Sequence, residues 1–170
     1  MAAATFQSGV NITLGFGIPG ELIVDGPQRV DSLILGSAGG TIGLAFTKSN
    51  STNVATMGGT IVNGTSVFAG ILVNPKTYAL DGYNSSGTLD PSMLVPPYSQ
   101  GEFLTMGTIV VNIVGSANIG DLVQYNNTTG VLSAVVPGGT VTTGNTFIPN
   151  CVIWNYPTSA TGLTAIRITN

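Results

Sequence analysis

The chain contains no histidine, and only 6% of its 170 residues are charged. Histidine is the commonest metal ligand and a frequent general base, so its absence excludes Ser-His-Asp and Cys-His catalytic arrangements. Four basic residues face seven acidic ones, and such a chain cannot neutralise many phosphates. We therefore expect no nucleic-acid binding, and a surface built mainly from Thr, Ser, Asn and Gly.

Cysteine is almost missing as well. Cys151 is the single cysteine, which excludes an internal disulfide framework. It lies in the apolar run CVIWNY (151–156), and with no histidine to activate it we predict a buried, unreactive thiol.

No uninterrupted apolar run approaches the roughly 18 residues of a membrane span. The first residues, MAAATFQSG, lack the charged start and apolar stretch of a signal peptide, so we expect no membrane association.

Apolar residues, by contrast, make up 43% of the chain, and they recur at every second position. The runs NITLGF (11–16) and TIGLAF (41–46) each place three apolar side chains on one face of a strand. Further strand candidates, rich in Val, Ile and Thr, are residues 30–35, 66–73, 103–114, 121–125, 131–135, 151–154 and 163–169. No segment shows a helical stripe. The pattern predicts an all-β fold, a compact β-barrel or jelly-roll-like sandwich of about ten short strands.

Turn-forming residues separate these predicted strands. In GDLVQYNNTTGVLSAV (120–135), two apolar runs flank a polar, glycine-containing turn, which predicts a β-hairpin. Residues 1–10 are small and polar around Phe6, so we expect a flexible N-terminal arm followed by a single domain over residues 11–170. Residues 81–102 contain three prolines and many Ser and Gly, which predicts a long surface loop, either a partner-binding loop or a plain connection.

The carboxylates offer the remaining route to chemistry. Six of the seven acidic residues stand beside Gly or Pro, where Asp commonly caps backbone N–H groups of a turn. We therefore favour turn caps over a glycosidase built from two acids such as Glu102 and Asp121. The run GFGIPG (15–20) spells Gly-x-Gly-x-x-Gly, but the strand-like ELIVDGP follows it instead of a helix. We expect no catalytic residues, no metal and no cofactor.

Aromatic residues are few, at 7% of the chain, and Trp154 is the only tryptophan. A sugar-binding site usually presents several exposed aromatic rings, and Trp154 with Tyr156 are the candidates for one. Within the apolar run CVIWNY we favour core and rim positions for these two residues.

Four stretches resemble one family: VDGPQRV (24–30), FAGILVNPKTYAL (68–80), GEFLTMGTIVVNI (101–113) and GDLVQYNNTTGVL (120–132). They are similar to segments of the structural cement, or capsid decoration, proteins of tailed bacteriophages. The N-terminal run GVNITLGFGIPGEL (9–22) fits the same pattern. These stretches cover about half of the chain, and none of them carries a catalytic motif.

The resemblance implies a β-barrel or jelly-roll-like module on the outer surface of an icosahedral phage head. Its partners would be the major capsid protein and further copies of itself, as a homodimer or homotrimer. Such a virion protein is made in the host cytoplasm and is not an enzyme. As contact residues we predict Phe6 in the arm and four residues of the long loop: Tyr83, Met93, Leu94 and Tyr98.

Two other classes of function stay open from the sequence. The first is a glycan-binding or adhesion module on a phage tail or fibre, with Trp154 and Tyr156 as the platform. The second is the two-acid glycosidase. A further virion role, in a tail tube or connector, is a smaller alternative.

Overall fold

The computed structural model describes residues 17–74 and 94–169. These residues form twelve β-strands and no α-helix, which confirms the all-β prediction. The strands are β1 (Leu22–Ile23), β2 (Arg29–Leu35), β3 (Gly40–Thr41), β4 (Ala45–Ser49), β5 (Val54–Met57), β6 (Ser66–Leu72), β7 (Leu94–Val95), β8 (Gln100–Val114), β9 (Leu122–Asn126), β10 (Leu132–Val135), β11 (Asn145–Asn155) and β12 (Gly162–Ile168). None of the described residues belongs to a helix able to cross a membrane.

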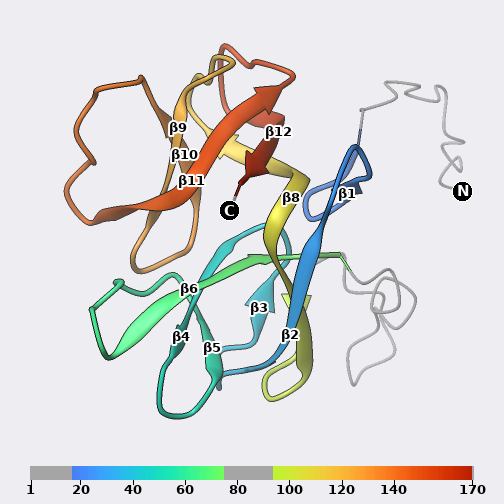
Figure 1. The fold of residues 1–170 in the computed structure, drawn as a ribbon, viewed down its shortest axis with the longest axis vertical. Helices are drawn as coiled ribbons and strands as arrows, with labels where there is room; N and C mark the ends of the chain where they lie inside the picture. The colour runs from blue at the N-terminus through green and yellow to red at the C-terminus, as the bar shows by residue number, and fades with distance from the viewer. Residues whose placement is uncertain (1–16, 75–93, 170) are drawn as a thin grey trace, which may run out of the picture.

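Five strands close into a barrel. Strand β8 pairs with β12, β12 with β11, β11 with β9 and β9 with β10, all antiparallel. The circle closes where β10 pairs with β8 in parallel, with Leu132 opposite Ile113. We call these five strands the C-terminal barrel; they fill the upper part of Figure 1, with β8 running down from them. The β9–β10 hairpin predicted for residues 120–135 is part of it.

The first half of β8 belongs to a second closed circle of strands. Here β8 pairs with β2, β2 with β5, β5 with β4, β4 with β6, and β6 again with β8. We call these five strands the N-terminal ring, seen in the lower part of Figure 1. The 15 residues of β8 therefore run through both closed circles.

The passage from one circle to the other occurs at Gly107. Met106 pairs with β2, whereas Gly107 pairs with Ile168 of β12. The φ angle of Gly107 is 127°, and an added Cβ would lie 2.9 Å from Cγ of Gln28. Side chains of L-residues rarely adopt this backbone conformation, so a glycine is required where β8 changes partners.

Two hydrophobic cores meet across the shared strands. Because successive residues of a strand point to opposite faces, Phe103 of β8 packs in the core of the N-terminal ring, and its neighbour Leu104 packs in the other core. Strand β6 divides in the same way at Ile71 and Leu72. All four side chains are fully buried. Each contributes about 1.5–3 kcal/mol relative to an exposed side chain.

Two of the sequence predictions are wrong in detail. The predicted strand 41–46 is broken, because Ile42 and Gly43 form a turn between β3 and β4, with Gly43 at a φ of 79°. The end of the predicted loop 81–102 is structured: β7 pairs with β3, and β8 already begins at Gln100. The predicted strand 11–16 and the predicted arm 1–10 lie outside the described residues.

Candidate functional site

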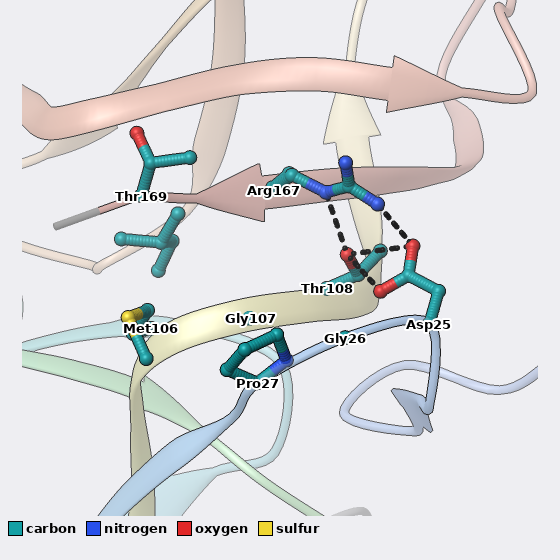
Figure 2. Close-up of a pocket in the computed structure, with 9 residues that line it drawn as sticks. Asp25, Gly26, Pro27, Met106, Gly107, Thr108, Arg167 and Thr169 are labelled. Carbon is teal, nitrogen blue, oxygen red and sulfur yellow. Dashed lines mark hydrogen bonds and ion pairs between the residues drawn. The ribbon is translucent and has the colours of Figure 1, made fainter.

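A depression of about 230 Å³ opens between the turn that follows β1, the middle of β8 and the end of β12. Figure 2 shows the side chains around it, which come from three segments far apart in the sequence. The lining residues are Asp25, Gly26, Pro27, Met106, Gly107, Thr108, Arg167, Ile168 and Thr169. Most of the lining is apolar; Asp25, Thr108 and Arg167 gather at one end, and Thr169 lies at the other (Figure 2).

The polar end is a network of three side chains. Strand pairing places Thr108 of β8 directly opposite Arg167 of β12, and the β1 residue Ile23 also pairs with Thr108. The turn after β1 thereby brings Asp25 over both residues. The Arg167 guanidinium forms an ion pair with the Asp25 carboxylate, and Arg167 Nε donates to the Thr108 hydroxyl oxygen at 3.1 Å. The Thr108 hydroxyl donates to Asp25 Oδ1 at 2.9 Å.

This network lowers the pKa of Asp25. Partial burial acts to raise that pKa, but hydrogen bonds from Thr108 and Arg167, together with the positive charge of Arg167, outweigh it. The pKa of Asp25 therefore lies below the usual value of 3.8. Asp25 stays ionised at neutral pH, and its charge is matched by that of Arg167, so this end of the depression carries no net charge.

Trp154 extends the cluster along the barrel surface. The Arg167 guanidinium carbon lies 3.4 Å from the centroid of the Trp154 ring, in a cation–π contact. The prediction that Trp154 is a core residue is wrong, since 44% of it is exposed. Cys151 and Ile153 of β11 point into the core, so the alternation of side chains along the strand turns Trp154 to the opposite, solvent-facing side. Tyr156 is also exposed, which fits the predicted rim position.

Two of the other acidic residues cap turns. An Asp121 carboxylate oxygen accepts from the Asn118 amide at 2.9 Å, and Glu21 accepts from the Ile18 amide at 3.2 Å. These two are turn caps, as predicted. Glu102 is different, because it is exposed inside strand β8 and not in a turn. Across residues 17–74 and 94–169, no group of three His, Cys, Asp or Glu side chains is arranged to hold a metal ion.

Cys151 is buried, as the sequence predicts. Complete desolvation raises the pKa of its thiol far above the ordinary value, so little thiolate forms near neutral pH. Cys151 lines a second hollow, of about 370 Å³, together with residues 147–150 and the ends of neighbouring strands.

The structure exposes the two predicted contact residues that it describes. Leu94 is 48% and Tyr98 is 73% exposed. The Tyr98 amide donates to the Leu35 carbonyl at 3.2 Å, and its φ angle is 61°. Ile34, next to Leu35, is exposed as well. The other predicted contacts, Phe6, Tyr83 and Met93, lie outside the described residues.

Comparison with known proteins identifies the family. Residues 6–169 match the model of a family described as structural cement protein (E217 gp24/Pam3 gp6). The chain belongs to this family. Family membership assigns the protein a structural role, in agreement with the resemblance seen in the sequence. No curated protein matches the chain.

A solved structure shares the fold of this cement protein. A chain in "The capsid of Myoviridae Phage XM1" superposes with a TM-score of 0.67, and the match covers 98% of both chains. The two sequences are 18% identical, so this likeness shows a common fold.

The cluster of Asp25, Thr108, Arg167 and Trp154 was missed by sequence reasoning. The only signal is Arg167 itself, a charged residue inside the apolar run LTAIRIT (163–169). Asp25 and Arg167 are 142 residues apart, and no local pattern connects them.

Proposed function

We propose that this protein is a non-enzymatic cement that binds the outer surface of an icosahedral phage head, across junctions between subunits of the major capsid protein. The match of residues 6–169 to the structural cement family carries this proposal. The capsid setting of the solved structure with the same fold supports it.

The physical basis of such a function is preferential binding. Packaged DNA pushes capsid subunits apart, and a protein that binds only across assembled junctions stabilises the closed shell by mass action. This requires contact area and rigidity instead of reactive groups. A standard interface buries about 1,600 Å². The protein is made in the host cytoplasm and assembles as a homodimer or homotrimer before it binds. Such an oligomer multiplies weak contacts through effective concentration.

The surface of the described residues suits this role. Interface cores are depleted in charge and enriched in aromatic residues. Tyr98 is 73% exposed and Val24 is 84% exposed, and the Asp25–Arg167 pair leaves no net charge beside Val24. The two closed circles of strands provide a stiff support for these positions.

A sedimentation assay tests the proposal. Purified full-length protein is mixed with expanded empty capsids of the parent phage and with unexpanded procapsids, and each mixture is pelleted. We expect the protein to pellet with expanded capsids up to a fixed number of copies per shell, and cryo-electron microscopy to place it outside, over subunit junctions. Protein that stays in the supernatant with its own expanded capsids contradicts the proposal.

The glycan-binding alternative has one observation in its favour, the exposure of Trp154 and Tyr156. Sugars stack on the open face of an aromatic ring, and the Arg167 guanidinium covers one face of Trp154. A single ring with one face covered is a poor sugar platform, so we expect no strong binding on a glycan array. A signal that is lost in Trp154→Ala would favour the adhesion module instead.

A further inference from the structure

The hairpin loop that leads into β6 contains the only Asn-Gly pair of the chain, Asn63-Gly64. An isolated bridge joins Val62 to Ser66 on either side of this loop. The amides of Thr65 and Ser66 both donate to the Val62 carbonyl, at 3.0 and 2.9 Å. The loop is thus fixed at its base, whereas its tip points into solvent.

The tip of this loop is open to solvent. Asn63 and Gly64 are both exposed. Nothing lies within 4 Å of the position that a Cβ of Gly64 would occupy. Among the described residues, the Gly64 amide donates no hydrogen bond. A hollow of about 340 Å³, lined by Asn50, Ser51, Gly64 and Thr65, admits water to the same place.

We propose that Asn63 is a site of spontaneous deamidation, which adds one negative charge to the surface of the folded protein. Asparagine is a chemically labile residue, and glycine gives the following peptide unit the conformational freedom that ring closure needs. A base, water or hydroxide, removes the proton of the Gly64 amide. The nitrogen then attacks Cγ of Asn63, a C–N bond forms, and ammonia leaves.

The product of this step is a five-membered succinimide. Water adds to either ring carbonyl and opens the ring, which gives aspartate or isoaspartate at position 63. The net reaction consumes one water and releases one ammonia. The formal net charge of −3 becomes more negative by one unit. Isoaspartate also lengthens the backbone inside the loop that Thr65 and Ser66 close.

The chain provides its own control in Asn127. The next residue is the branched Thr128 instead of glycine, and the Asn127 side-chain oxygen accepts a hydrogen bond from the Thr146 hydroxyl at 2.7 Å. The same conditions therefore act on a free and on a restrained asparagine within one molecule.

Ageing the purified full-length protein in mildly alkaline buffer tests this inference. Peptide mapping should show that the peptide containing Asn63 gains the mass difference between an amide and a carboxylic acid, while the Asn127 peptide stays unchanged. An isoaspartyl methyltransferase should label the same peptide, and the rate should rise with pH. The acidic species should be absent in Asn63→Gln, and its aspartate form should elute with Asn63→Asp. The inference is overturned if Asn63 stays intact in the folded protein while it deamidates in the denatured chain, because the loop then protects it.

Discussion

The guanidinium of Arg167 lies over the ring of Trp154, with 3.4 Å between the guanidinium carbon and the ring centroid. The same guanidinium binds Asp25 and Thr108. One cation thus connects β11, β12, β8 and the turn after β1, in a chain that has only four basic residues.

Removing the positive charge of Arg167 should lower the stability of the protein. Arg167→Met keeps an apolar stem but loses the ion pair and the cation–π contact, and we expect a loss of about 1–2 kcal/mol in the free energy of unfolding. The free energy of unfolding of Arg167→Lys should lie between those of the parent protein and Arg167→Met, because a lysine keeps the charge without the planar guanidinium. Trp154 is the only tryptophan, so its fluorescence reports on the contact directly. An emission spectrum unchanged in Arg167→Met would contradict the stacking.

The Asp25 network should make stability depend on acid. The pKa of Asp25 is lowered in the folded protein, so its stabilising contribution is complete above the usual pKa near 3.8 and is lost as the pH falls through the lower, folded value. Denaturant unfolding of the parent protein and Asp25→Asn should differ by about 1 kcal/mol at neutral pH. The difference should disappear in strong acid. In an Arg167→Met background it should be smaller at every pH, and an undiminished difference there would assign the effect to another partner of Asp25.

A side chain at Gly107 should destabilise the protein. Gly107→Ala places a residue at a φ of 127° and its Cβ against Gln28, which should cost about 1–3 kcal/mol of stability. Gly26→Ala is the matched control, because nothing lies within 4 Å of its Cβ position and its φ is not positive. Thermal unfolding measures both. Equal melting temperatures for the two variants would show that β8 does not need a glycine where it changes partners.

Tyr98 should matter for capsid binding and not for folding. Because Tyr98 is 73% exposed, Tyr98→Ala should leave the melting temperature nearly unchanged. As an aromatic anchor, its loss should weaken binding to expanded capsids by about tenfold or more. Tyr156→Ala is a matched control, an exposed tyrosine that also has a positive φ. If both variants bind like the parent protein, Tyr98 is not a contact residue.

The thiol of Cys151 should react only after unfolding. Burial raises its pKa and hides it from reagents, so a thiol-specific dye should label the native protein slowly and the denatured protein stoichiometrically. Rapid labelling of the native protein at mildly alkaline pH would show that the hollow beside Cys151 opens in solution.

Apolar runs rich in Val and Ile predicted the strands well, including the two strands that place side chains in both cores. Residues 103–114 lie within β8, and residues 66–72 form β6. The alternation failed at residues 41–46, where Ile42 and Phe46 are buried but Gly43 turns the chain between them. Apolar residues on both sides of a turn imitate a strand, because burial alone sets the pattern.

The pairing of strands that are far apart in the chain could not be predicted from the sequence. The parallel contacts of β10 with β8 and of β2 with β5 close the two circles, yet each involves two residue pairs. The pairing of β11 with β12 also shifts register between Ile153 and Asn155. Such register shifts depend on how neighbouring strands pair, and no local sequence pattern specifies that pairing.

The continuity of β8 through both circles has a mechanical consequence. Two modules that merely touch can be peeled apart at their interface by breaking weak contacts one after another. Here, a pull applied to one circle reaches the other along the covalent backbone of a single strand. Separating the two circles requires stripping β8 from the strands that it pairs with in one of them, so its hydrogen-bond ladders hold the halves together.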